Sequence, residues 1–202
     1  MTVDRIEPID KKRCKVFLNG EFAFALYRGE LRRYQIEEGE ELPEAVVREI
    51  MDTVVCRRAR ERSLYLLKFS SRTEGELRRK LQSGWYPEEA VEYAVSFLKR
   101  YHYLDDREYV RNYLEVHSGR KSRAELTQTL MRKGVDRELI RELSEESAPD
   151  SEEAIKRLLK KRGYDPGQAS PELRRKTIAY LMRRGFPYEE IRHQIGCLEE
   201  ME

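Results

Sequence analysis

The chain has 202 residues, 40 of them basic and 38 acidic, so charged side chains make up 39% of it while the net charge is only +2. A strongly disordered chain would show fewer apolar residues and a larger charge imbalance. The excess of Arg, Glu, Lys and Leu, with few Gly and Pro, favours a helical protein with much exposed surface. No apolar run approaches the roughly 18 residues that a membrane-spanning helix needs, which excludes a helical membrane protein.

The first 42 residues are predicted to form a small β structure. The segments Cys14–Leu18 and Glu21–Tyr27 are rich in β-branched and aromatic residues, and Asn19 and Gly20 stand between them. Both residues readily take positive φ, so the dipeptide predicts a tight type I′ hairpin. Arg5–Ile9 is a candidate third strand, in which a proline favours the sheet edge.

The hairpin is expected to bury one apolar face. A two-residue loop places Leu18 opposite Glu21 and Phe17 opposite Phe22. Strict alternation would then put four large side chains on one face, namely Phe17, Phe22, Phe24 and Leu26. Because a lone hairpin is marginal in water, we expect this face to pack on the helix that begins near Pro43.

From Pro43 onward the apolar period becomes helical. The residues at i, i+3, i+4 and i+7 of one stripe are apolar, namely Val47, Ile50, Met51 and Val54. Capping boxes are predicted at Ser71 with Glu74 and at Ser122 with Glu125, since each hydroxyl and each carboxylate would satisfy one free N–H group. Further helices are expected at residues 106–117, at 151–162 and after Ser170.

Three segments of the chain align without gaps: residues 76–91, 125–140 and 176–191. Leu81, Leu130 and Leu181 coincide, and each segment is typical of a helix, a tight turn and a second helix. Gly134 and Gly185 follow the first helix of their copies, where a left-handed residue is favoured. The first copy has Trp85 there, after Gly84, so its turn is expected to differ.

The repeat predicts the domain organisation. Offsets of about 50 residues and the intervening helices define a three-helix unit, and units of this size bury their apolar stripes partly against their neighbours. We therefore expect a mainly α fold: three tandem three-helix repeats in an elongated curved array, preceded by a small N-terminal β-hairpin. The predicted boundaries are 1–42 for the hairpin segment and 43–104, 105–149 and 150–202 for the repeats.

Several runs, in this order and spacing, resemble the RecX family of RecA regulators: Ser71–Leu81, Tyr103–Val110, Ser122–Leu126, Arg132–Asp136 and Met182–Ile191. The resemblance covers roughly residues 43–196. It departs at Trp85, where the family tends to have Gly, and the hairpin lies outside its three-repeat core.

The resemblance implies a cytoplasmic, non-catalytic regulator with a role in recombinational DNA repair and the SOS response. Proteins of this kind bind the RecA–single-stranded DNA filament along its groove and bridge its protomers. They hinder ATP hydrolysis, strand exchange and coprotease activity, and some bind DNA directly. No cofactor is implied, and we expect a monomer.

Local basic clusters supply the candidate contacts with this partner or with DNA. Contacts between Lys or Arg side chains and DNA phosphates make binding strongly salt-dependent. The simpler interpretation of each cluster is a solvated helix face, with cations near helix C-termini. The loop at Arg120–Arg123 fits that interpretation least, because it lies at a helix N-terminus. The candidates are Arg120, Lys121, Arg123, Arg132, Lys133, Arg174, Arg175, Arg183, Arg184, Arg78 and Arg79.

The aromatic residues are mostly expected in the core. Tyr101, Tyr109 and Tyr113 fall on helical stripes, which favours packing over stacking on bases. Trp85 and Tyr86 lie at a turn, and both interpretations stay open for them.

The sequence contains few features that would favour catalysis or metal binding. The sequence has no phosphate-binding Gly-rich loop and no dinucleotide fingerprint. His193 and Cys197 alone would make a poor metal site. Cys14, Cys56 and Cys197 have no metal-like spacing, and the N-terminus has no apolar signal region, so we expect a reducing cytoplasm. Two alternatives to a RecA regulator remain: a helical repeat protein that binds single- or double-stranded DNA without a recombinase, and an enzyme such as a nuclease.

Overall fold

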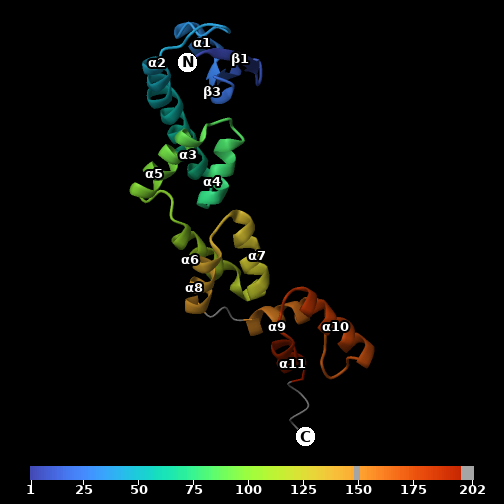
Figure 1. The fold of residues 1–202 in the computed structure, drawn as a ribbon. Helices are drawn as coiled ribbons and strands as arrows, with labels where there is room; N and C mark the ends of the chain where they lie inside the picture. Colours follow the sequence, from blue (N-terminus) through green and yellow to red (C-terminus); the bar gives the residue numbers. More distant parts are fainter. Residues whose placement is uncertain (148–150, 197–202) are drawn as a thin grey trace. The chain divides into compact units, whose positions relative to one another are not determined.

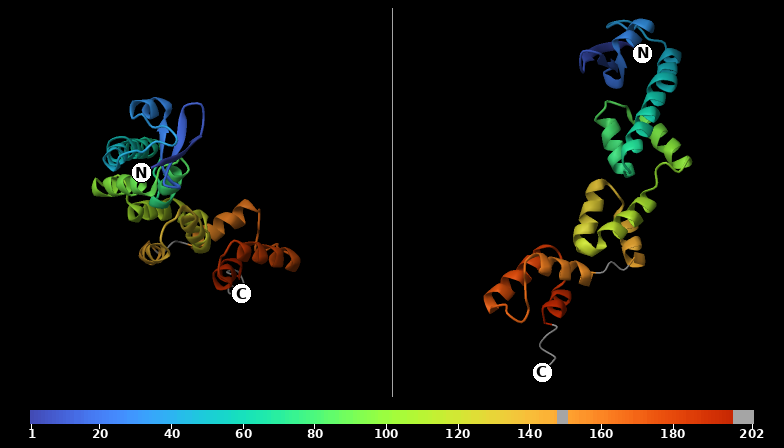
Figure 2. Two further views of the ribbon diagram at one scale, coloured as in Figure 1. Left: turned by 45° about the horizontal axis from the view of Figure 1, so that its top comes forward. Right: turned by 180° about the vertical axis from the view of Figure 1, so that it is seen from behind.

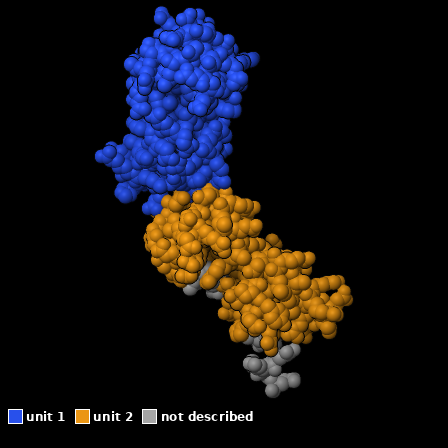
Figure 3. All heavy atoms as spheres, viewed as in Figure 1, with its two compact units in different colours: residues 1–105 blue, residues 106–202 orange. Residues whose placement is uncertain are grey.

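The computed structural model describes residues 1–147 and 151–196. The chain divides into two compact units, residues 1–105 and 106–202 (Figure 3). The predicted boundary at 149/150 and Cys197 lie outside the described residues.

The N-terminal unit begins with a three-stranded antiparallel sheet in the order β1 (Val3–Pro8), β2 (Arg13–Leu18), β3 (Glu21–Tyr27) (Figure 1). The predicted third strand therefore exists, at the sheet edge. Asn19 and Gly20 have φ of +49° and +84°, as the type I′ turn requires. The expected pairs of Leu18 with Glu21 and Phe17 with Phe22 are confirmed.

A β-bulge changes which aromatic residues share a face. Val16 pairs with Phe24 while its neighbour Phe17 pairs with Phe22, so Ala23 has no partner. Phe24 consequently lies on the buried face with Val16, and Phe17 and Phe22 lie on the opposite face. The prediction of one shared face was wrong because the extra residue resets the alternation.

The buried face of the sheet packs on a long helix, as expected. After α1 (Arg28–Arg33), a short helix that the sequence analysis did not predict, the chain forms α2 (Glu44–Glu49), a π-helical segment η1 (Ile50–Cys56) and α3 (Arg57–Phe69). These three run on as one continuous helix (Figure 2). The wider π turns bring Ile50, Met51, Val55 and Cys56 into the core. The predicted apolar stripe ended at Val54, but in the structure Val55 is buried and Val54 is only half-buried.

Helices α4 (Glu74–Gln82) and α5 (Glu88–Arg100) complete the unit and share one core with the sheet. The capping box of α4 is formed by Thr73 and Glu76, not by Ser71 and Glu74. That prediction was wrong by two residues because both pairs have the same spacing, and tertiary packing decides between them: Thr73 is buried and Ser71 exposed.

The second unit contains six α-helices within its described residues. Helices α6 (Asp106–His117), α7 (Arg123–Lys133) and α8 (Arg137–Ser147) surround one core, with a 3₁₀ turn η2 (Ser118–Arg120) between α6 and α7. Helices α9 (Ser151–Lys161), α10 (Pro171–Arg183) and α11 (Tyr188–Gly196) surround another. The predicted N-caps Ser122 and Ser170 are confirmed.

The three aligned turns have the same backbone geometry. Trp85, Gly134 and Gly185 have φ of +64°, +91° and +82°. The next residue in each copy donates a backbone hydrogen bond to the aligned leucine carbonyl, over 3.2, 3.2 and 3.3 Å. The expectation of a different first turn was therefore wrong: Trp85 takes the left-handed conformation that glycine takes in the other copies.

Among the described residues, no helix is long and apolar enough to span a membrane. Nor does this part of the chain bring three His, Cys, Asp or Glu side chains together in a group that could hold a metal ion.

Candidate nucleic-acid interface

The cluster at Arg120, Lys121 and Arg123 lies between α6 and α7. Arg120 and Arg123 are exposed and form no ion pair with any described residue. Lys121 is half-buried, and its Nζ donates a hydrogen bond to the Tyr113 hydroxyl over 2.7 Å. Two of the three cations are therefore available to an anionic partner, while the third also braces α6.

The charge of this cluster acts on His117, the last residue of α6. Burial lowers the pKa of His117, and the charges of Lys121 and Arg120 lower it further. These effects favour the neutral imidazole, so the positive potential at this site comes from the lysine and the arginines.

The start of α7 is already capped. The Ser122 hydroxyl accepts a hydrogen bond from the Glu125 N–H over 3.1 Å, and the Glu125 carboxylate accepts one from the Ser122 N–H over 3.3 Å. These two N–H groups already have acceptors. A phosphate at this helix end would therefore accept hydrogen bonds from arginine side chains and not from these backbone N–H groups.

An arginine-lined pocket of about 190 Å³ lies between α7 and α8. Arg123 borders it together with Arg137 and Arg141, which stand one helical turn apart on α8. The pocket is also lined by one carboxylate, Glu145, and by Ser144, whose buried hydroxyl has no hydrogen-bond partner among the described residues. An unpaired hydroxyl beside three guanidinium groups is an arrangement that suits an anionic oxygen ligand.

Arg137 and Arg141 were not among the predicted contacts, because neither stands in a run of consecutive basic residues. Their signal was the i, i+4 spacing on α8, directly after the second repeated turn. Arg141 also pairs with Glu138 at the surface.

On its other side, Arg123 borders an acidic hollow of about 450 Å³ lined by Glu152, Glu189 and Glu190. These carboxylates would repel phosphate. The pocket between α7 and α8 is therefore the favourable side for an anionic ligand at Arg123.

Arg184, a candidate from the third repeat, is used inside the protein. Its guanidinium binds the Glu125 carboxylate, and its carbonyl accepts a hydrogen bond from the Ser122 hydroxyl over 2.5 Å. The hydrogen bond that Arg184 donates to the Glu125 carboxylate raises the pKa of Arg184. This contact docks the turn after α10 against the start of α7.

The remaining third-repeat candidates are spread along α10. Arg175 and Arg183 are exposed and form no ion pair with described residues. Arg174 is half-buried near α11, and its charge acts to lower the pKa of Tyr164 against the larger, raising effect of burial. Arg175 and Arg183 are therefore the candidates on α10 that face solvent without a carboxylate.

The first-repeat candidates differ sharply. Arg78 is surrounded by carboxylates, with ion pairs to Glu74, Glu88 and Glu92 over 2.8, 3.3 and 2.5 Å. Arg79 is exposed and lines a pocket of about 230 Å³ with Arg72 and Lys80. The structure therefore favours Arg79 over Arg78 as a surface contact.

Arg132 and Lys133 end α7, about 15 Å from Arg123 at 1.5 Å per residue. Arg132 is exposed, while Lys133 is half-buried with its Nζ 5.4 Å from the centre of the Tyr109 ring. They form a site separate from the cluster at the start of the helix.

The aromatic predictions were right in part. Tyr109 and Tyr113 are half-buried and stack with their ring centres 6.3 Å apart. Tyr101 was wrongly predicted in the core: it ends α5 and is 55% exposed. Tyr86 is half-buried, and Trp85 is 40% exposed beside Phe22 and Lys15.

Comparison with known protein families shows that three segments of the chain each match one domain of the same family. They are RecX, first three-helix domain, at residues 59–98; RecX, second three-helix domain, at 105–143; and RecX, third three-helix domain, at 150–195. Similar proteins are each named regulatory protein RecX. One from Bacillus velezensis is 28% identical over 95% of this chain and 73% of its own length. One from Clostridium beijerinckii is 26% identical over 94% and 91% of the two chains. One from Caldanaerobacter subterraneus subsp. tengcongensis is 28% identical over 95% and 96%.

Two solved structures are also similar. A crystal structure of regulatory protein RecX has a TM-score of 0.65 and 26% identity, and it covers 97% of this chain and 98% of its own. A crystal structure of RecX from Lactobacillus salivarius has a TM-score of 0.59 and 18% identity over 71% and 96% of the two chains, which concerns the fold alone.

Proposed function

The chain belongs to the RecX family, and from that premise we propose that it regulates the RecA recombinase. It binds the RecA–single-stranded DNA filament across neighbouring protomers and lowers its ATPase, strand-exchange and coprotease activities. It acts in the cytoplasm as a monomer, by binding alone, and catalyses no reaction.

The observation that carries this proposal is the succession of three RecX three-helix domains along residues 59–195. The arginine-lined pocket at Arg123, Arg137 and Arg141 supports it, because arginines at such a site can bind DNA phosphates or acidic groups of the recombinase. Several weak contacts on successive repeats would add up, because each one raises the effective concentration for the next.

The test is the ATPase activity of RecA on single-stranded DNA, titrated with this protein beside a binding assay on DNA alone. We expect inhibition at less than stoichiometric protein, with weak binding to DNA alone. An unchanged ATPase together with tight binding to DNA alone would reject the regulator.

Alanine variants test whether the Arg120–Arg123 cluster contacts the filament. Replacing Arg120, Lys121 and Arg123 together by Ala is expected to weaken filament binding and to flatten its salt dependence by about 0.7 per lost phosphate contact. The matched control replaces three exposed cations of α9, Arg157, Lys160 and Lys161, and should leave both unchanged. An equal loss in the two variants would mean that only net charge matters.

The second candidate function is a DNA-binding repeat protein that acts without a recombinase. The same arginine pocket favours it, since phosphates of free DNA would fit the site equally well. The assay on DNA alone separates the two functions, because only the second requires tight, steeply salt-dependent binding there.

A further inference from the structure

The first unit carries a continuous line of basic and aromatic side chains outside the candidate sites described above. We propose that this line binds one strand of single-stranded nucleic acid directly, through its phosphates and its unpaired bases. We call it the basic–aromatic strip. It consists of Lys11, Lys12, Tyr27, Arg28, Arg58, Arg62, Tyr65 and Phe69.

The strip begins at one end of the sheet. The backbone N–H of Arg28 donates to the Lys12 carbonyl over 2.9 Å, which joins the start of α1 to the β1–β2 turn. Tyr27, the last residue of β3, pairs with Arg13 beside the same turn. Three cations and a tyrosine from two chain segments therefore gather at this end of the sheet.

Arg58 connects the sheet end to α3. Its guanidinium lies 4.7 Å from the centre of the Tyr27 ring and donates to the Ala25 carbonyl over 3.3 Å. It also pairs with Glu30 of α1. These three contacts hold the end of the sheet against the start of α3.

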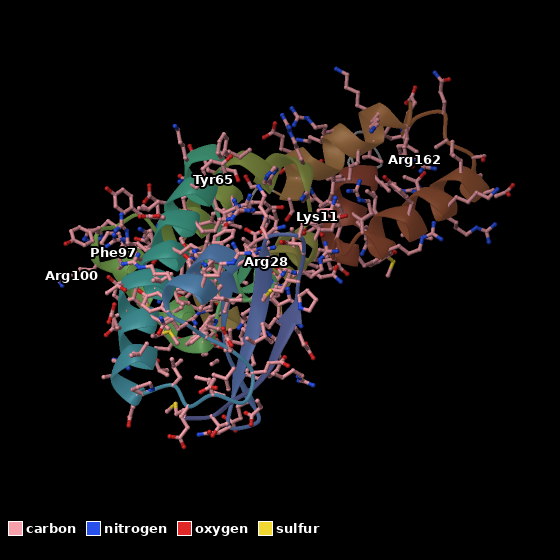
Figure 4. The ribbon with its side chains drawn as sticks, turned by 90° about the horizontal axis from the view of Figure 1, so that it is seen from above. Lys11, Arg28, Tyr65, Phe97, Arg100 and Arg162 are labelled. Carbon is pink, nitrogen blue, oxygen red and sulfur yellow. The ribbon has the colours of Figure 1, made fainter. Side chains whose placement is uncertain are left out.

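The strip continues along one face of α3. Arg58, Arg62, Tyr65 and Phe69 follow one another at intervals of four, three and four residues, so they share a face of the helix. The Arg62 guanidinium lies 5.5 Å from the Tyr65 ring, and the Tyr65 and Phe69 rings meet edge to face at 4.9 Å. In Figure 4, Lys11, Arg28 and Tyr65 mark the turn, the start of α1 and the middle of α3.

The strip has an excess of positive charge. The carboxylates beside it are paired: Asp10 with Arg13, Glu30 with Arg58, and Glu61 with Arg57. Lys11, Lys12, Arg28 and Arg62 form no ion pair with any described residue. Four unneutralised cations along one line are the electrostatic complement of a polyanion.

The exposed aromatic rings indicate which class of polyanion the strip binds. Tyr27, Tyr65 and Phe69 are 41%, 55% and 67% exposed, although rings of this size normally contribute to a core. Bases of a single strand stack on such rings, whereas a duplex hides its base faces and an acidic peptide has none to offer. Cations interleaved with exposed rings therefore fit a single strand best.

This inference goes beyond the proposed function, because it assigns single-strand binding to a surface of the first unit, whereas the arginine pocket invoked above lies between α7 and α8. Its test accordingly uses the full chain and nucleic acid alone. The response of the RecA ATPase does not bear on the strip, because the strip is tested by comparing oligonucleotide binding of a strip variant with that of its control.

The experiment measures the anisotropy of a fluorescent single-stranded oligonucleotide of about 16 nucleotides, an upper site size for one binding platform. Arg62→Ala with Tyr65→Ala should weaken binding about tenfold, since a lost base stack and a lost phosphate contact add. Arg100→Ala with Tyr101→Ala is the matched control. Tyr101 is also 55% exposed, and its arginine lies 5.9 Å from the ring centre, so the control should change binding less than twofold.

A second variant tests the phosphate contacts separately. Lys11→Ala, Lys12→Ala and Arg28→Ala together should lower the slope of log K against log salt by about 2, or 0.7 for each cation. All three side chains are exposed, so the fold is expected to survive, as circular dichroism would check. Equal affinity of the Arg62/Tyr65 variant and its control would overturn the proposal. So would competition by a duplex or by poly-glutamate as strong as that by the single strand.

Discussion

Arg184 and Glu125 stand 59 residues apart in the chain, and the arginine donates two hydrogen bonds to the carboxylate, over 2.9 and 3.3 Å. Glu125 also caps α7 together with Ser122, whose hydroxyl donates to the Arg184 carbonyl. One end of α7 therefore receives both its own cap and the turn of the following repeat. This contact sets how the second and third repeats dock.

Gly185 gives the sharpest test of that docking. A Cβ on Gly185 would lie 2.7 Å from the Ala124 Cβ, and φ is +82°. We expect Gly185→Ala to lower the free energy of unfolding by about 2–4 kcal/mol, because a clash adds to left-handed strain. Gly163→Ala is the control, since its φ of +62° imposes the strain while nothing lies within 4 Å. It should cost about 1 kcal/mol in chemical denaturation, and equal losses would contradict the close contact.

Arg184 and Arg183 are neighbours with opposite expected roles. Arg184→Ala should lower stability by about 1 kcal/mol, because it breaks a half-buried, doubly hydrogen-bonded ion pair. Arg183→Ala, at an exposed position, should change stability by less than about 0.5 kcal/mol. Thermal denaturation of both variants checks this, and a larger loss at Arg183 would show that the assignment is reversed.

Thr73 and Ser71 distinguish two possible caps of α4. Thr73→Ala should cost about 1 kcal/mol, because the hydroxyl accepts the Glu76 N–H over 3.1 Å. Ser71→Ala should cost little, since Ser71 is exposed and lies outside the observed capping box. Urea titrations of the two variants measure the difference, and a costly Ser71→Ala would restore the cap that sequence spacing first indicated.

The ion pairs of Arg78 predict a pH dependence. Burial raises the pKa of Glu74, but hydrogen bonds from Lys99 and Arg78 outweigh it, so the pKa is lowered from 4.5. The hydrogen bond from Arg78 also lowers the pKa of Glu92. Because the folded pKa values lie below the unfolded ones, this stabilisation is complete above about pH 4.5 and is lost as the pH falls further.

Arg78→Met should therefore destabilise the protein at neutral pH and make its stability fall less steeply below pH 4.5. The exposed pair of Arg57 with Glu61 provides the control, since Arg57→Met should alter neither quantity much. Denaturation midpoints across this pH range give the comparison. Parallel curves for the native chain and Arg78→Met would exclude the arginine as the cause.

Which basic residues lie free at the surface could not be predicted from their order in the chain. Arg183 and Arg184 are adjacent and chemically identical, yet one faces solvent and the other binds Glu125. Arg78, next to the exposed Arg79, is bound by Glu74, Glu88 and Glu92, two of which lie 10 and 14 residues further along the chain. The partners stand up to 59 residues away, so no local pattern announces them.

Features that depend on neighbours along the chain were determined by the sequence alone. The Asn19-Gly20 turn, the caps at Ser122 and Ser170 and the period of the repeat all arise from backbone preferences and hydrogen bonds within a few residues. The sharing of Phe faces, the left-handed Trp85 and the choice of Thr73 as a cap were decided by tertiary structure. In each of these, contacts with segments distant in the chain outweigh a local preference worth about 1 kcal/mol: strand pairing for the Phe residues, Phe22 and Lys15 for Trp85, and burial for Thr73.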